Sequence, residues 1–145
     1  MTETTGTPVE SIRKALLGYR ITAWITGIWL IALCYEMGRF GAEVNLPTLY
    51  RIFYRFGTPL FVLKKASRLW DVHYDSGRLD ADQTGDNAVM LTIVEFERPH
   101  RAHCLSVLGW ATRSIELSGA ELTRGEETRC RTRGDSSCTL ELAWR

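Results

Sequence analysis

The stretch from Ile21 to Tyr35 constrains the fold most, because its 15 residues are apolar on almost every helical face and lie between Arg20 and Glu36. A helix that is apolar all round must be enclosed. The stretch is shorter than the roughly 20 apolar residues that a bilayer-spanning helix needs. We therefore expect no transmembrane segment, and expect this helix to be buried in a core or against a second copy of the chain.

Length and charge favour one soluble domain. The 145 residues match a single core, with a flexible polar tail at 1–7 and one domain at 8–145. Lys and Arg number 18 against 17 Asp and Glu, so no strong field favours nucleic acid as a partner. Four cysteines are too few for a disulfide scaffold, and the first 20 residues lack a leader-like apolar segment, so we expect a cytoplasmic protein.

The first half of the chain predicts helices. Pro8 begins one that ends near Tyr19, and a second runs over 21–40. A third is expected over 45–57, where Asn45 and Pro47 supply a start and Gly57 a stop. A fourth follows over 58–70.

The second half predicts a sheet with one inserted helix. A short segment at 78–82 lies between two turns, and 88–96 is typical of a strand covered on both faces. Pro99 begins a helix that ends at Gly119, and the segments 120–132 and 136–144 form a hairpin around a three-residue loop. The expected fold class is α+β: N-terminal helices packed beside a twisted, mostly antiparallel sheet, with one inserted helix and a C-terminal hairpin.

Three cysteines of the second half predict a metal site. A hairpin symmetric about Gly134 places Cys130 and Cys138 directly opposite one another, with Cβ atoms about 4.5–5.5 Å apart. Zinc accepts two thiolates at that separation, and Cys104 on the preceding helix is the natural third ligand. If no metal binds, Cys104 is a buried core thiol, and Cys130 and Cys138 are a cross-strand pair of thiols. If the protein is exported, one pair of these cysteines could form a disulfide.

The fourth ligand stays open on the residues alone. The parity of an undistorted strand puts Glu126 on the face of Cys130, whereas a bulge near Gly125 would put Glu127 there. His100 and His103 are further candidates.

The segment HCLSVLGWATRSIELSGAELTRGEETRCRTRGDSSCTLELAWR resembles the C-terminal half of the 4-vinyl reductase domain family, which is related in fold to TRAPP-type vesicle-tethering subunits. The similarity covers about residues 100–145. It consists of a helix cysteine followed by a Gly, a Glu three residues before a second cysteine, and a Gly-Asp pair before a third. The resemblance implies that Cys104, Glu127, Cys130 and Cys138 hold a structural zinc ion, and that the helical half pairs into a homodimer.

Two further surfaces are candidates for binding. Aromatic side chains that could line an apolar pocket between helices and sheet are Trp24, Phe53, Phe61, Trp70 and Phe96. A partner protein could be met by Trp29 and by three arginines that alternate along the expected strand, Arg129, Arg131 and Arg133.

These observations favour a function in binding over catalysis. The chain has no G-x-S-x-G, phosphate-binding loop, dinucleotide fingerprint or H-E-x-x-H motif. We expect a non-catalytic, zinc-containing regulatory or adaptor domain that binds a partner protein and a small hydrophobic ligand. The alternatives are a ligand-free assembly subunit like the tethering proteins and, less favoured, an enzyme related to tetrapyrrole vinyl reductases, for which the sequence offers no reductant site.

Overall fold

The structure is a computed structural model, and it describes residues 8–49 and 58–145. The elements in chain order are α1 (Pro8–Leu49), α3 (Pro59–Ser67), α4 (Trp70–His73), β1 (Arg78–Gly85), β2 (Ala88–Val94), α5 (Arg101–Leu117), β3 (Leu122–Arg129), a 3-10 helix (Arg131–Arg133) and β4 (Cys138–Trp144). Four strands and a layer of helices make an α+β fold, so the predicted fold class is confirmed.

Helix α1 is a single helix of 42 residues. The prediction of separate helices at 8–19 and 21–40 is wrong, because no residue between Tyr19 and Ile21 interrupts helical hydrogen bonding. The helix start predicted at Asn45 and Pro47 is wrong too, since both residues lie within α1. The stop predicted at Gly57 lies outside the described residues.

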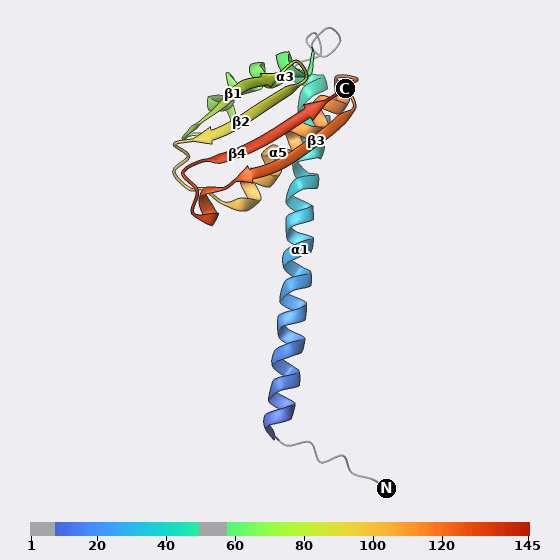
Figure 1. Cartoon of the computed structure of the whole chain (residues 1–145), viewed down its shortest axis with the longest axis vertical. Coiled ribbons are helices and arrows are strands. Elements are labelled where there is room, and N and C mark those ends of the chain that lie inside the picture. The colour runs from blue at the N-terminus through green and yellow to red at the C-terminus, as the bar shows by residue number, and fades with distance from the viewer. Residues whose placement is uncertain (1–7, 50–57) are drawn as a thin grey trace.

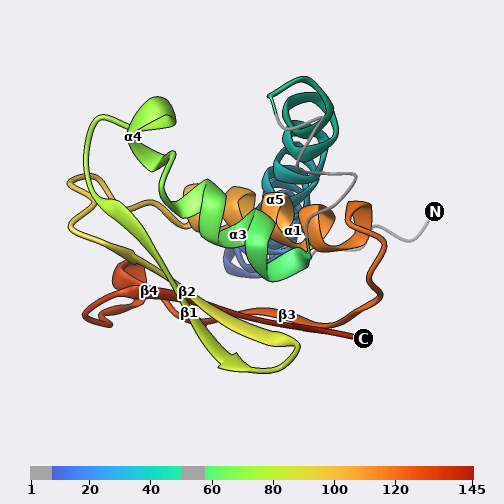
Figure 2. The same cartoon turned by 90° about the horizontal axis from the view of Figure 1, so that it is seen from above.

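The sheet has the strand order β1-β2-β4-β3, and every neighbouring pair is antiparallel. In Figure 2 the described helices lie together on one face of this sheet. Strand β2 accordingly buries every second residue, Val89, Leu91 and Ile93, and leaves those between them half-buried. The expectation that this strand is covered on both faces is therefore wrong.

Helix α5 packs between the sheet and the C-terminal half of α1. Its inward residues, among them Val107, Leu108, Ala111 and Ile115, join the sheet side chains in the main core. The predicted helix from Pro99 to Gly119 is confirmed within two residues at each end. Gly119 follows the helix with φ +87°, a conformation that glycine adopts without strain.

Two glycines set the distance between α1 and α5. A Cβ on Gly109 would lie 2.0 Å from the carbonyl oxygen of Tyr35, and one on Gly38 would lie 1.9 Å from that of Ser106. No side chain fits at either position while the helices keep this separation. The crossing therefore depends on glycine from both helices.

Polar contacts accompany this close crossing. Thr112 Oγ1 donates to the carbonyl of Gly109, so the Tyr35 hydroxyl, 2.9 Å away, donates to Thr112. The Arg39 guanidinium donates to both carboxylate oxygens of Glu116, at 3.1 and 3.0 Å. This pairing lowers the pKa of Glu116 and raises that of Arg39. Helices α1 and α5 are thus joined by specific polar bonds as well as by apolar contact.

Candidate metal centre

Three cysteines from separate elements converge at one end of the core. Cys104 lies in the first turns of α5, Cys130 directly precedes the 3-10 helix, and Cys138 begins β4. Their sulfur atoms all lie within 4.8 Å of one another, all three residues are buried, and none forms a disulfide. Three buried thiols at this separation could hold a metal ion.

The predicted symmetry of the β3–β4 hairpin holds at one pair only. Arg129 pairs with Thr139, which is centred on Gly134, whereas the pairs from Glu127–Leu140 onward are displaced from that symmetry. Cys130 and Cys138 are not paired with each other in the described ladder. The strands nevertheless end at Arg129 and restart at Cys138, so the predicted three-residue loop is wrong. Residues 130–137 form a longer connection, because the 3-10 helix and Gly134, at φ +99°, turn the chain there.

Hydrogen bonds fix the cysteines within this connection. The Cys130 N–H donates to Asp135 Oδ2 at 2.7 Å, and the Cys130 carbonyl accepts from the N–H of Arg133 at 2.8 Å. The Arg131 N–H points to Cys138 Sγ at 3.4 Å, and Thr132 Oγ1 lies 3.0 Å from Cys130 Sγ. These bonds hold the sulfurs of Cys130 and Cys138 in place within the connection.

The surroundings of Cys104 disfavour the ionised form of its thiol. Burial raises the pKa of the Cys104 thiol, and the neighbouring Cys138, Cys130 and Glu127 raise it further. Negative groups crowded in a low-dielectric site cannot all ionise without compensation. A bound cation would lower the pKa of these thiols instead, because it would be the largest local charge and would deprotonate a thiol that coordinates it.

Glu127, rather than Glu126, faces this end of the core. An irregularity in the β3 register between Glu127 and Arg129 turns the chain, and Glu127 pairs with the buried Leu140. Its side chain is 4% exposed, and neither carboxylate oxygen has a hydrogen-bond partner among the described residues. Arg101 Nε and Arg133 Nη2 each lie 3.4 Å from Oε2. The carboxylate lies outside the 4.8 Å group of sulfurs.

The two histidines considered as ligands lie elsewhere. His100 caps α5, where its Nδ1 accepts from the N–H of Ala102 at 3.2 Å. His103 is stacked on Phe96, with ring centroids 4.4 Å apart, and lies edge-on to Tyr74 at 4.8 Å and to Trp70 at 5.7 Å. Both its ring nitrogens are buried without a partner among the described residues, and burial lowers its pKa. His103 therefore belongs to an aromatic cluster beside the thiols.

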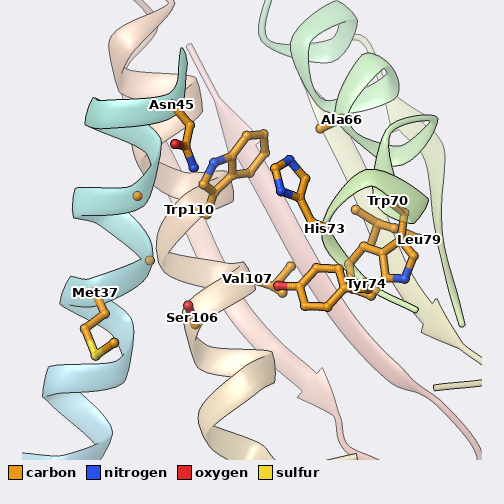
Figure 3. Close-up of a pocket in the computed structure, with 12 residues that line it drawn as sticks. Met37, Asn45, Ala66, Trp70, His73, Tyr74, Leu79, Ser106, Val107 and Trp110 are labelled. Carbon is orange, nitrogen blue, oxygen red and sulfur yellow. The ribbon is translucent and has the colours of Figure 1, made fainter. Parts of the chain in front are cut away.

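A cavity of about 330 Å³ lies between α1, α5 and the α3–α4 segment. Figure 3 shows the Tyr74 ring, from the residue directly after α4, pointing toward α5, while the His73 ring at the end of α4 points toward Trp110. The lining residues are Met37, Gly38, Gly41, Asn45, Ala66, Trp70, His73, Tyr74, Leu79, Ser106, Val107 and Trp110. The Trp70 indole is fixed there, because Nε1 donates to the Ser76 carbonyl at 3.0 Å and its ring stacks on Tyr74.

The residues predicted for the pocket lie in different places. Trp70 lines the cavity, Phe96 packs in the aromatic cluster, and Phe61 is 45% exposed on α3. The side chain of Trp24 and all of Phe53 lie outside the described residues. Sequence reasoning missed the polar and aromatic lining from α1 and α5, because the crossing of these helices, which has no local signal, creates the cavity.

The residues predicted for a partner surface are also dispersed. Trp29 on α1 is 71% exposed, and Arg129 is exposed at the end of β3. Arg131 Nη1 donates to the Phe96 carbonyl at 2.6 Å, and Arg133 lies beside Glu127. Because Arg131 and Arg133 belong to the 3-10 helix, the predicted alternation of three arginines along one strand is wrong.

The described chain is an α+β domain with a buried cluster of three cysteines. A trafficking protein particle complex subunit 3 from Naegleria fowleri, covalently bound to palmitic acid, aligns over 94% of this chain and 97% of its own, with a TM-score of 0.59 and 12% identity. An H-NOX protein from S. oneidensis, in its Fe(II)NO ligation state, aligns over 79% of this chain and 65% of its own, with a TM-score of 0.62 and 10% identity. At these identities the likeness shows the fold alone.

Relatives in sequence are mycobacterial. Uncharacterized proteins of Mycobacterium tuberculosis and Mycobacterium bovis are 79% identical over 40 residues, which make up 27% of this chain and 33% of theirs. One from Mycobacterium leprae is 79% identical over 28 residues, or 19% of this chain and 24% of its own. The match thus spans a third or less of the length of these relatives. No family model matches the chain.

Proposed function

We propose that this chain is a non-catalytic, zinc-containing regulatory or adaptor domain that works by binding a partner protein, with a small hydrophobic ligand in its cavity. The proposal includes membership of the 4-vinyl reductase domain family, which the C-terminal residues resemble. A cytoplasmic location, where thiols stay reduced, remains part of it. In the part of the chain that the structure describes, no helix combines the length and apolarity that crossing a bilayer requires.

The convergence of three buried, unbridged thiols carries the proposal. Tetrahedral zinc with Zn–S bonds of about 2.3 Å separates its sulfurs by about 3.8 Å, and the observed group is close enough to reach that arrangement by rotamer adjustment. Three sulfurs and one oxygen suit zinc better than magnesium or calcium, which prefer all-oxygen sites. Bound there, zinc would supply the positive charge that the buried groups lack.

Glu127 is the fourth ligand that the family resemblance implies. Its carboxylate is buried without a hydrogen-bond partner among the described residues, and Arg101 and Arg133 form ion pairs with it at 3.4 Å. Binding of zinc by this carboxylate would exchange these two ion pairs for a metal bond. We therefore propose Glu127 as the fourth ligand, completing a set with Cys104, Cys130 and Cys138 that ties α5 to the β3–β4 connection.

The cavity supports a small, uncharged, largely apolar ligand. Its volume of about 330 Å³ falls at the lower end of the range for small-molecule sites. Two indoles and a phenol offer flat apolar walls, and none of the described lining residues is Asp, Glu, Lys or Arg. The Tyr74 hydroxyl, whose pKa burial raises, is available to donate a hydrogen bond that orients the ligand.

A ligand-free assembly subunit is the second candidate. The full-length likeness to a vesicle-tethering subunit favours it. Native mass spectrometry of the freshly purified protein separates the two: a stoichiometric adduct of a few hundred daltons supports the ligand, whereas a bare chain held with a partner protein supports the assembly role.

Metal content tests the zinc assignment directly. We expect one zinc per chain in protein purified without chelators, released by a mercurial that modifies the thiols and detected with a zinc indicator. Cys34 on α1 serves as control, because a Cys34→Ala variant keeps all three clustered sulfurs and should keep its zinc. Wild-type protein that carries no metal would refute the assignment.

A further inference from the structure

Two arginines accompany the three clustered cysteines. Arg101 Nε and Arg133 Nη2 each lie 3.4 Å from the same atom, Oε2 of the buried Glu127. Arg101 is three residues before Cys104 on α5, and Arg133 is three residues after Cys130. The 3-10 helix and the first turn of α5 lie at one edge of the body, away from the projecting N-terminal half of α1 (Figure 1). The elements that carry the cysteines therefore carry the arginines too.

This spacing keeps both arginines beside the thiols when the Glu127 side chain moves. Residues three apart on a helix lie on the same face, with Cβ atoms about 5–6 Å apart, and Arg101 and Cys104 have this relation in α5. Arg133 belongs to the single turn that Cys130 begins, because the Cys130 carbonyl accepts from the Arg133 N–H at 2.8 Å. A carboxylate that turns to a metal ion thus leaves both guanidinium groups at the centre.

The proposed zinc centre needs positive charge besides that of the ion. Three thiolates and one carboxylate exceed the charge of Zn²⁺, so the occupied centre carries two negative charges in excess. Water offers little compensation, since Cys104, Cys130 and Cys138 are buried and Glu127 is 4% exposed. Excess charge in a buried site is costly unless groups of the opposite sign lie beside it.

Arg101 and Arg133 match this requirement in number and in position. Their side chains are 44% and 43% exposed, so they lie at the rim of the centre and lose only part of their hydration. The other charged side chains of residues 130–137 are Arg131, whose guanidinium donates to a backbone carbonyl, and Asp135, whose carboxylate accepts from a backbone N–H. Because these two have opposite charges, they leave the excess of the centre unchanged.

The contact between the arginines and Glu127 is electrostatic rather than directional. Neither Glu127 oxygen has a hydrogen-bond partner among the described residues, although both arginines lie at ion-pair distance. We propose that Arg101 and Arg133 neutralise the zinc centre: they pair with Glu127 while the site is empty and balance the charge of the ligands once zinc is bound. They would thereby set the affinity for the metal. This role rests on the proposed zinc centre and adds two positioning residues to it.

Zinc affinity, measured by competition with a chromophoric chelator, tests the proposal. Replacing a residue that supports metal ligands typically costs 10–100-fold in metal affinity, so we expect Arg101→Gln and Arg133→Gln each to weaken zinc binding about tenfold. Arg101→Lys and Arg133→Lys keep the charge and should stay within about threefold of wild type. The control Arg129→Gln removes the same charge from an exposed position at the end of β3 and should change the affinity by less than about threefold.

Cobalt(II) in place of zinc separates an electrostatic role from a structural one. A positive charge beside the thiolates holds the sulfur electrons more tightly, so its removal should shift the thiolate-to-cobalt charge-transfer absorption to longer wavelength. We expect this shift in Arg101→Gln and not in Arg101→Lys. Near-ultraviolet circular dichroism shows whether each variant is folded, and Arg101→Met, which keeps much of the side-chain stem, replaces a Gln variant that does not fold.

Three results would overturn this proposal and leave the zinc centre standing. They are Gln variants that bind zinc as tightly as Arg129→Gln, Lys variants that bind it as weakly as the Gln variants, and a weakened Gln variant whose cobalt absorption is unchanged. The zinc centre itself fails in a different way. Wild-type protein that binds no zinc would refute the centre, and the role of the two arginines with it.

Discussion

The two parts of α1 before and after Tyr35 are both rich in apolar residues but have different surroundings. From Tyr35 onward, one face of the helix is held by glycine contacts and by bonds to Thr112 and Glu116. Before Tyr35, described apolar side chains such as Trp29 and Leu30 are more than half exposed. Hydrophobicity alone therefore does not determine where a helix is packed. Small residues and matched polar groups decide which stretch joins the body.

The largest loss of stability should come from removing a ligand of the proposed zinc centre. Cys130→Ala or Cys138→Ala removes a proposed zinc ligand, and structural zinc contributes about 10 kcal/mol of apparent binding free energy, comparable with the stability of a whole domain. We expect such variants to be insoluble or molten, as judged by near-ultraviolet circular dichroism. Cys34→Ala, on α1 away from the thiol cluster, should stay folded. Equal behaviour of the two classes would contradict a stabilising metal.

The glycine contacts provide the next test, because they distinguish the two halves of α1. Gly109→Ala forces a methyl group against the Tyr35 carbonyl and should lower the free energy of unfolding by about 3 kcal/mol or more. In the projecting half, Gly27 has no atom within 4 Å of an added Cβ. Gly27→Ala should raise helix stability by up to about 1 kcal/mol. Urea unfolding measures the free energy of unfolding of both variants. If α1 and α5 are not closely packed, Gly109→Ala should destabilise the protein no more than Gly27→Ala does.

A smaller effect should follow from the ion pair across the α1–α5 crossing. The Arg39 hydrogen bonds lower the pKa of Glu116 below its usual 4.5, so ionised Glu116 stabilises the fold above that pH. This stabilisation, about 1 kcal/mol for a partly exposed pair, is lost as the pH falls through the lowered pKa. The stability difference between wild type and Glu116→Gln should therefore shrink from pH 7 to pH 3.5. A difference that is constant over this range would show that the pair contributes nothing.

The smallest change in stability should come from the cavity. The Tyr74 hydroxyl makes no hydrogen bond to the described residues, so Tyr74→Phe should alter the free energy of unfolding by less than about 0.5 kcal/mol. If a ligand accepts a hydrogen bond from this hydroxyl, the same variant should lose most of its co-purified ligand in native mass spectrometry. Unchanged ligand occupancy in the Tyr74→Phe variant would show that Tyr74 does not bind the ligand. The Ser106→Ala variant tests in the same way whether the Ser106 hydroxyl on α5 binds it.

Much of the body could be predicted from local patterns. The bounds of α5 follow from its apolar spacing and from Gly119. A run rich in β-branched residues and preceded by a turn predicted β2, and alternation predicted β4. The pairing of β3 with β4 as a hairpin also follows from the sequence, because strand pairing across a turn depends on residues close together in the chain. The predicted register holds only at Arg129 and Thr139. The candidate metal ligands could be named for the same reason, since three of the four lie within twelve residues.

The features that only the tertiary structure determined depend on contacts between segments that are distant in the chain. Parity along an ideal strand favours Glu126, and only the register irregularity before Arg129 turns Glu127 inward. The cavity lies beside the crossing of α1 and α5, and the glycines that permit this close crossing, Gly38 and Gly109, are 71 residues apart. The sequence by itself determined the elements and the ligand types, because those depend on local hydrogen bonding and side-chain chemistry. Packing alone determined which apolar surface became core and which stayed exposed.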